Sequence, residues 1–123
     1  MVQSFRDLTV WQKSMTLTER VYKATEKFPK TEMFGLTAQM RRASVSIPSN
    51  IAEGKAISGR GYPKHLRIAL GSEAELQTQI ELCVRLKLLA QTDGRNLIEE
   101  TSEVGRMLRG LLQSLTRPDD AQN

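Results

Sequence analysis

The chain has 123 residues, which is enough for one domain with a single hydrophobic core. Aromatic residues make up 5% and prolines number four, while helix formers such as Leu, Ala, Glu, Gln and Lys recur throughout, so we expect an all-α protein. No apolar run approaches the roughly 20 residues of a membrane span, and no signal-peptide pattern opens the chain, which indicates a cytoplasmic protein with no membrane partner. The one cysteine, Cys83, excludes an internal disulfide and a cysteine metal cluster within one chain.

The positive charge is concentrated in the first half of the chain. Residues 1–61 contain ten Lys and Arg against five Asp and Glu, a balance of +5, and residues 62–123 contain eight against nine, a balance of −1, which together give the net charge of +4. Such an excess favours an anionic partner. The alternative is that the charge only keeps a small helical protein soluble.

The first predicted helix spans residues 8–28 and ends before Pro29. A step of about 100° per residue places its apolar side chains in two stripes about 130° apart. One stripe contains Leu8, Trp11, Met15 and Tyr22, and the other contains Val10, Leu17, Val21, Ala24 and Phe28. One stripe is enough for packing within a small bundle, so the second indicates deep burial or a second partner surface.

The second predicted helix spans residues 37–57 and contains Pro48. Proline removes one backbone hydrogen bond, and its ring crowds the carbonyl group four residues earlier, that of Ser44. Because the inward apolar spacing continues to Ile51, we expect one kinked helix and not two helices. Small residues around the proline would allow a neighbouring helix to approach closely, so most of the stretch RRASVSIPSNIAEG is interpreted as packing.

The third predicted helix spans residues 62–90 and again has two apolar faces. Its inward face includes Glu73 among apolar residues, and its second stripe includes Glu75. The apolar members of that second stripe are Ile68, Leu82, Leu86 and Leu89.

The fourth predicted helix, residues 95–116, has the regular apolar spacing of a bundle seam and stops before Pro118. Short connections between long helices predict an antiparallel up-down-up-down four-helix bundle over residues 1–117. Residues 118–123 are predicted to form a disordered tail.

Several stretches resemble one bacterial family of four-helix-bundle proteins. They are FRDLTVWQKS, FPKTEMFGLTAQMRRASVSIPSNIAEG and HLRIALGSEAELQTQ, in that order from Phe5 to about Leu89. The first described members of the family are encoded by intervening sequences within 23S ribosomal RNA genes. The resemblance implies closed bundles that assemble into pentameric rings, with no established biochemical activity for most members. A related branch, the accessory proteins of diversity-generating retroelements, has a basic surface and is associated with reverse transcriptase and nucleic acid.

The residues do not indicate an enzyme. His65 is the only histidine, so a zinc site of the usual composition cannot form within one chain, and we expect no catalytic residue, metal or cofactor. Glu73 and Glu75 point to opposite sides of one helix and cannot act together on a substrate. A buried glutamate paired with an arginine is the preferred interpretation, because an antiparallel pairing of the second and third helices would bring Arg41 or Arg42 within reach of Glu75. Asn50 is interpreted as a buried hydrogen-bonding residue that sets helix register.

Two functional hypotheses remain, both of them for a homo-oligomer. In the first, the protein binds RNA or DNA through phosphate contacts from basic residues along the second helix and the following loop. These residues are Arg41, Arg42, Lys55, Arg60, Lys64 and Arg67. In the second, the protein is a scaffold that presents a ring-shaped surface to a protein partner.

Subunit contacts are predicted for the second apolar stripes of the first and third helices. The residues assigned to them are Ile68, Leu82, Leu86, Leu17 and Val21. A pentamer is favoured on the basis of the family resemblance.

Overall fold

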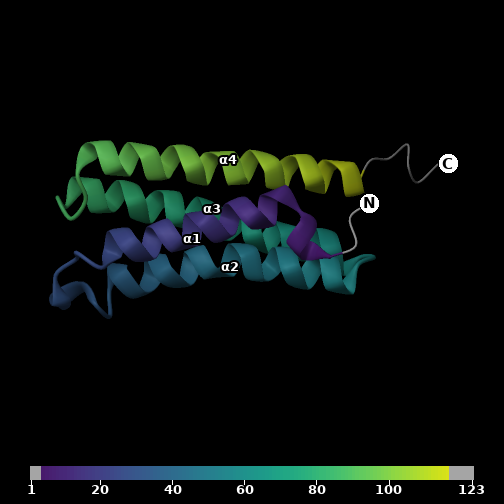
Figure 1. Cartoon of the computed structure of the whole chain (residues 1–123), viewed down its shortest axis with the longest axis horizontal. Helices are drawn as coiled ribbons and strands as arrows, with labels where there is room; N and C mark the ends of the chain where they lie inside the picture. The colour runs from purple at the N-terminus through teal and green to yellow at the C-terminus, as the bar shows by residue number, and fades with distance from the viewer. Residues whose placement is uncertain (1–3, 117–123) are drawn as a thin grey trace.

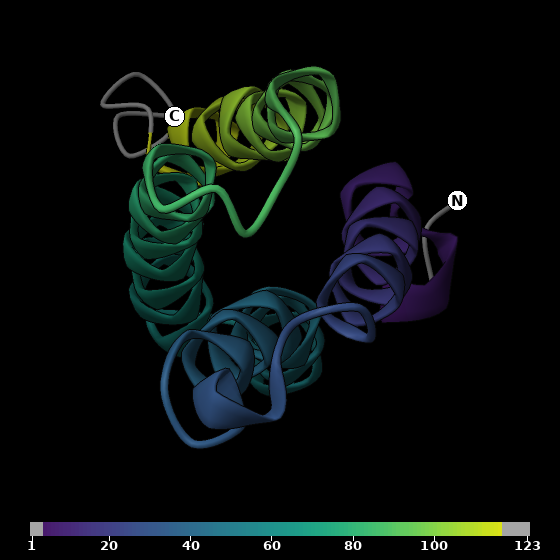
Figure 2. The same cartoon turned by 90° about the vertical axis from the view of Figure 1, so that its left-hand side faces the viewer.

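The computed structural model describes residues 4–116. This part of the chain forms four long helices, α1 (Thr9–Thr25), α2 (Leu36–Ile57), α3 (Gly61–Arg85) and α4 (Gln91–Leu115), and the short 3-10 helices η1 (Phe5–Asp7) and η2 (Lys30–Glu32). The long helices run alternately up and down (Figure 1), and in end view they follow one another around the bundle in chain order (Figure 2). The arrangement confirms the predicted all-α up-down four-helix bundle. The predicted tail at residues 118–123 lies outside the described residues.

Two helices end earlier than predicted, and both do so at the end of the bundle distant from the termini. α1 stops at Thr25 instead of residue 28, and α3 stops at Arg85 instead of residue 90. α3 ends because Lys87 takes a left-handed conformation with φ of 62°, which turns the chain so that the Leu88 N–H donates to the Cys83 carbonyl at 2.9 Å. No glycine marks this turn in the sequence, so the pattern could not locate it.

The core contains the predicted inward faces of α2, α3 and α4. Its largest fully buried apolar side chains are Leu17, Val21, Met40, Ile47, Ile51, Leu66, Leu76, Ile80, Val104 and Leu108. In the part of the chain that the structure describes, no helix has both the length and the hydropathy of a membrane span.

The prediction that Leu17 and Val21 contact a neighbouring subunit is wrong. Both side chains are fully buried in the bundle core, whereas Met15 and Tyr22 of the other α1 stripe are exposed. The spacing of apolar residues separates the two stripes of a helix but does not say which of them faces its own bundle.

α2 continues as one helix through Pro48, as predicted. The Ser44 carbonyl, which Pro48 leaves without its usual helical donor, lies 2.9 Å from the Thr18 hydroxyl of α1. The same hydroxyl is also 2.9 Å from the Ser14 carbonyl of its own helix. A side chain of the neighbouring helix therefore supplies the hydrogen bond that proline removes.

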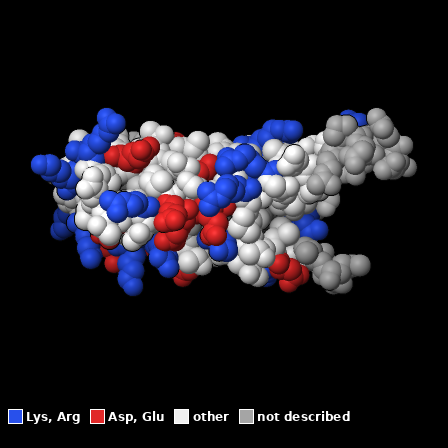
Figure 3. Space-filling view, turned by 90° about the horizontal axis from the view of Figure 1, so that it is seen from above, with Lys and Arg blue, Asp and Glu red and all other residues white. Residues whose placement is uncertain are grey.

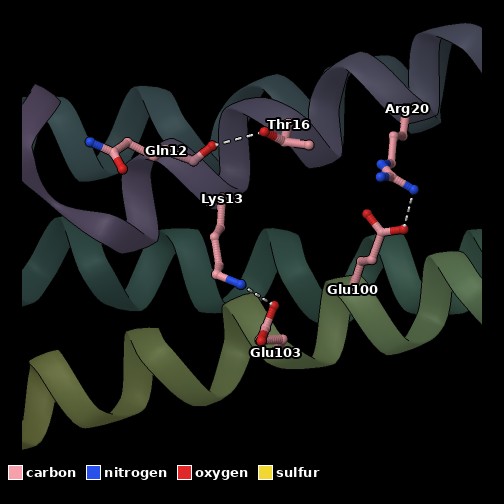
Figure 4. A network of polar contacts seen from close by, with 6 residues as sticks. All are labelled: Gln12, Lys13, Thr16, Arg20, Glu100 and Glu103. Carbon is pink, nitrogen blue, oxygen red and sulfur yellow. Dashed lines mark hydrogen bonds and ion pairs between the residues drawn. The ribbon is translucent and has the colours of Figure 1, made fainter.

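The neighbouring helices α1 and α4 are joined by ion pairs between exposed basic side chains of α1 and half-buried acidic side chains of α4 (Figure 4). Lys13 Nζ lies 2.9 Å from Glu103 Oε1, and Arg20 NH1 lies 2.9 Å from Glu100 Oε1. Seen from above, acidic side chains gather in the middle of the molecule, and Lys and Arg gather toward the end opposite the termini (Figure 3). On this face, Lys and Arg are therefore most numerous at the end opposite the termini.

Candidate nucleic-acid interface

Four of the predicted phosphate ligands surround the connection between α2 and α3. Lys55 lies in the last turn of α2, Arg60 in the connection, and Lys64 and Arg67 in the first two turns of α3. Arg60, Lys64 and Arg67 are exposed and Lys55 is half-buried. Residues 53–67 contain these four cations against the single carboxylate of Glu53, a formal balance of +3 with His65 neutral. We call these four residues the basic turn.

The backbone of the basic turn is compact and closely packed. Ser58 and Gly59 both have positive φ values, 61° and 57°, and the Ser58 N–H donates to the Gly54 carbonyl at 2.8 Å. A Cβ atom added to Gly54 would lie 3.0 Å from Tyr62 Cδ1 and 3.1 Å from His65 Cβ, so α2 and α3 approach closely here. The cations are therefore presented by two helix ends held firmly together.

A chain of polar contacts joins α2 to α3 next to the basic turn. His65 Nδ1 lies 2.9 Å from Asn50 Oδ1, and Asn50 Nδ2 donates to the Ser46 carbonyl at 2.9 Å. The Ser72 hydroxyl then donates to Ser46 Oγ at 2.8 Å. These contacts confirm Asn50 as a hydrogen-bonding residue between helices, although it is half-buried and not fully buried as predicted. Its partner His65 was missed, although an antiparallel pairing about residues 58–60 places positions 50 and 65 near each other.

The basic turn retains its charge. Among the described residues, none of its four cations has a carboxylate within 4.0 Å, whereas Lys13 and Arg20 of α1 are paired with acidic residues of α4. Glu53 instead lies 3.6 Å from His65 Nδ1. The fold therefore neutralises part of the positive excess of the first half and leaves the basic turn unpaired.

Arg41 and Arg42 lie apart from the basic turn, near the other end of α2. The Arg41 guanidinium stacks on the Tyr22 ring, 4.5 Å from its centroid, and its Nε donates to Thr25 Oγ1 at 2.9 Å. Arg42 is exposed. Both arginines share a surface depression with Glu75, but within residues 4–116 neither comes within ion-pairing distance of it. The predicted pairing with Glu75 is therefore wrong, because α1 supplies closer partners for Arg41.

The buried carboxylate of Glu73 also has a different partner from the predicted arginine. The Gln77 side-chain amide, one helical turn along α3, donates to it. Its other close neighbour is Gly105 of α4, where an added Cβ atom would lie 2.7 Å from the carboxyl carbon. Glu73 therefore occupies space that a glycine on the facing helix leaves open.

Cys83 lies in the core with its Sγ atom 3.4 Å from the Met40 sulfur. Burial, and secondarily the charge of Glu32, raises the pKa of the Cys83 thiol to about 11, so it is protonated at neutral pH. Within residues 4–116, no group of three or more His, Cys, Asp or Glu side chains is placed to hold a metal ion.

The outer face of α3 exposes the predicted apolar stripe. Ile68 is 44% exposed, Leu82 43% and Leu86 54%, and Glu75 is exposed on the same face. Leu89, which the pattern placed in this stripe, is buried beyond the end of α3. The remaining three apolar side chains are therefore about half exposed in the single bundle.

The bundle and its sequence are similar to known proteins. Its fold matches a crystal structure, at 1.70 Å resolution, of a protein with unknown function from the S23 ribosomal protein family of Bacteroides thetaiotaomicron VPI-5482. The TM-score is 0.77 and the identity 23%, over 85% of this chain and 99% of that chain, so the match establishes the fold alone. The comparison with curated proteins finds no match. Residues 6–110 match the family model described as 23S rRNA-intervening sequence protein, and the chain therefore belongs to that family.

Proposed function

We propose that the protein is a non-catalytic, oligomeric module that binds RNA or DNA through the phosphate groups. The observation that carries this proposal is the basic turn, where Lys55, Arg60, Lys64 and Arg67 lie without an acidic partner among the described residues. Lys and Arg side chains on phosphates provide affinity and orientation without reading the sequence.

The basic turn favours phosphate binding over base recognition. Tyr62 is the nearest aromatic residue in the sequence, but it is buried, and burial raises the pKa of its hydroxyl group. Its ring is therefore not available for stacking on a base at this surface. We expect binding that depends steeply on salt and little on sequence.

Self-association would repeat the basic turn around an assembly. Five copies, the number that the family resemblance implies, would carry a formal charge of 5 × 4, or +20. The exposed α3 stripe of Ile68, Leu82 and Leu86 supports such a contact, because a lone bundle leaves it in water. We expect Ile68→Glu or Leu82→Glu to dissociate the oligomer in sedimentation velocity, and Ile57→Glu, an equally apolar-to-acidic change at an exposed site on α2, to leave it intact. A stable monomer of the unmodified protein at micromolar concentration would contradict the oligomer.

Binding is tested by replacing the four residues of the basic turn with glutamine. We expect lower affinity for RNA or DNA of mixed sequence, and a slope of log K against log salt that falls by about one unit for each phosphate that is no longer bound. The matched control carries Lys13→Gln, Arg20→Gln, Arg106→Gln and Arg109→Gln, which changes the net charge equally on the α1–α4 side. If both quadruple variants lose affinity equally, the basic turn is not the binding surface.

If the unmodified protein does not bind RNA or DNA in gel shifts at low salt, the scaffold hypothesis is favoured instead. The exposed α3 stripe would then serve a protein partner as well as, or instead of, a second subunit. Such an apolar contact would persist at high salt, which separates it from phosphate binding.

A further inference from the structure

Phe34 is the most exposed large apolar side chain in the described part of the chain, at 91%. It lies in the connection between α1 and α2, which is built from consecutive hydrogen-bonded turns. The Met33 N–H donates to the Lys30 carbonyl at 3.1 Å, and the Gly35 N–H to the Glu32 carbonyl at 3.0 Å. Glu32 Oε1 also accepts from the Leu36 N–H at 3.3 Å, at the start of α2. An ordered backbone therefore holds an aromatic ring out in water.

Cations are numerous on the segments that lie, with Phe34, at the end of the bundle opposite the termini. The α1–α2 connection and the α3–α4 turn both lie at this end (Figure 1), where Lys and Arg gather (Figure 3). Residues 23–42 contain five cations against two carboxylates, a balance of +3, and residues 85–95 contain three against one, a balance of +2. The cations on these segments are Lys23, Lys27, Lys30, Arg41, Arg42, Arg85, Lys87 and Arg95. None of them has an ion-pair partner among the described residues.

A second flat surface lies beside this end. The Tyr22 ring is 40% exposed and carries the Arg41 guanidinium at 4.5 Å, with Arg42 lining the same depression. A planar guanidinium held on an aromatic ring is itself a surface on which a base can stack. Phe34 and the Tyr22–Arg41 pair therefore provide stacking surfaces among cations.

The combination fits a single-stranded nucleic acid better than other occupants. Unpaired bases stack on exposed aromatic rings while their phosphates contact neighbouring Lys and Arg, and bases within a duplex are not free to do so. Lysine is depleted from the cores of protein interfaces, so the lysines on the segments at this end disfavour a protein partner. A second copy of the same end would bring two positive surfaces together.

We propose that this end of the bundle binds an unpaired stretch of RNA or DNA, with Phe34 stacked on a base and the surrounding cations on the adjacent phosphates. The site is separate from the basic turn, which lies at the opposite end of α2, and does not depend on it. It adds a preference for unpaired strands that phosphate contacts alone would not give.

The test compares a single strand with an abasic strand of equal charge, and with a duplex whose bases are already paired. Fluorescence anisotropy at about 50 mM salt, with strands of about 12 nucleotides, measures binding of a single strand, an abasic strand and a duplex. We expect Phe34→Ala to weaken single-strand binding by about tenfold, within the range of a base–aromatic stack, and to leave abasic-strand binding and the salt slope unchanged. Phe34→Trp should restore the affinity. Ile57→Ala, which removes a 61% exposed apolar side chain at the other end of α2, should have no effect.

Three results would overturn the proposal. The first is equal affinity of Phe34→Ala and the unmodified protein for the single strand. The second is an equal loss for the single and abasic strands, and the third is dissociation of the oligomer by Phe34→Ala, which would make Phe34 a subunit contact. If Phe34→Ala has no effect but the glutamine variant of the basic turn loses affinity, only this inference fails. The reverse pattern would remove the basic turn and leave the Phe34 site in place.

Discussion

Replacing Thr18 by valine keeps the shape of the side chain and removes the hydroxyl that lies 2.9 Å from the Ser44 carbonyl oxygen. Pro48 has no N–H, so this carbonyl then has no donor from its own helix either. A buried carbonyl left without a partner destabilises the folded state by about 1–3 kcal/mol. We therefore expect Thr18→Val to lower the free energy of unfolding by about 1.5 kcal/mol.

The same change should matter less when residue 48 has an N–H. In a Pro48→Ala background, the alanine N–H can donate to the Ser44 carbonyl within α2, and we expect Thr18→Val to lower the free energy of unfolding by less than about 0.5 kcal/mol. The Ser14 carbonyl, the other neighbour of the hydroxyl, keeps its helical donor in both backgrounds. The four proteins form a double-mutant cycle with a coupling energy of about 1 kcal/mol.

Urea denaturation of the four proteins at one concentration, followed by circular dichroism, measures this coupling energy. The control is Thr16→Val, whose exposed hydroxyl donates to the Gln12 carbonyl of its own helix, at 3.3 Å (Figure 4). It should have the same small effect with Pro48 and with alanine. A coupling energy for Thr18 within about 0.3 kcal/mol of zero would refute the idea that α1 supplies the donor missing from α2.

Three further predictions concern stability. Gly54→Ala should lower the free energy of unfolding by about 1 kcal/mol, because strain against α3 exceeds the gain in helix propensity. Gly110 has open space around it, so Gly110→Ala should raise the free energy of unfolding by about 0.5–1 kcal/mol in the same urea assay. Ser58→Gly should raise the melting temperature, because Ser58 has φ of 61° and ψ of −168°, a region that favours glycine; no change would argue against strain there. The Cys83 thiol ionises near its ordinary pKa of 9.0 in the unfolded chain and near a pKa of about 11 in the folded one, so its contribution to stability is complete below pH 9 and is lost between pH 9 and 11. Cys83→Ala should flatten that part of the pH–stability curve, and an unchanged curve would contradict the burial argument.

The sequence by itself determined the helices, because helix formation depends on neighbours three and four residues apart. The spacing of Met40, Ala43, Ile47 and Ile51 identified the buried face of α2 through Pro48, and the same rule identified the inward faces of α3 and α4. Asn50 stood out as a polar residue on an apolar helix. Short connections then left the up-down bundle as the arrangement that buries these faces.

The tertiary structure decided which residues meet across helices. Thr18 donates to the Ser44 carbonyl, and Gln77 and Gly105 contact Glu73. The contacts between helices depend on the axial position of each helix relative to its neighbour. Side-chain spacing within one helix does not determine this relative axial position. The predicted pair of an arginine with Glu75 was wrong for this reason.

Charge and exposure depended on the fold in the same way. The six basic residues predicted as one surface are divided along α2, because Arg42 and Lys55 are 13 positions apart (55 − 42), about 20 Å along the helix. Leu17 and Tyr22 belong to stripes of similar apolar character, yet only Leu17 is buried. In the sequence, nothing distinguishes Phe34 from the other apolar residues that precede a helix. Its exposure results from the turns that connect α1 to α2, and burial is a property of the whole bundle rather than of neighbours along the chain.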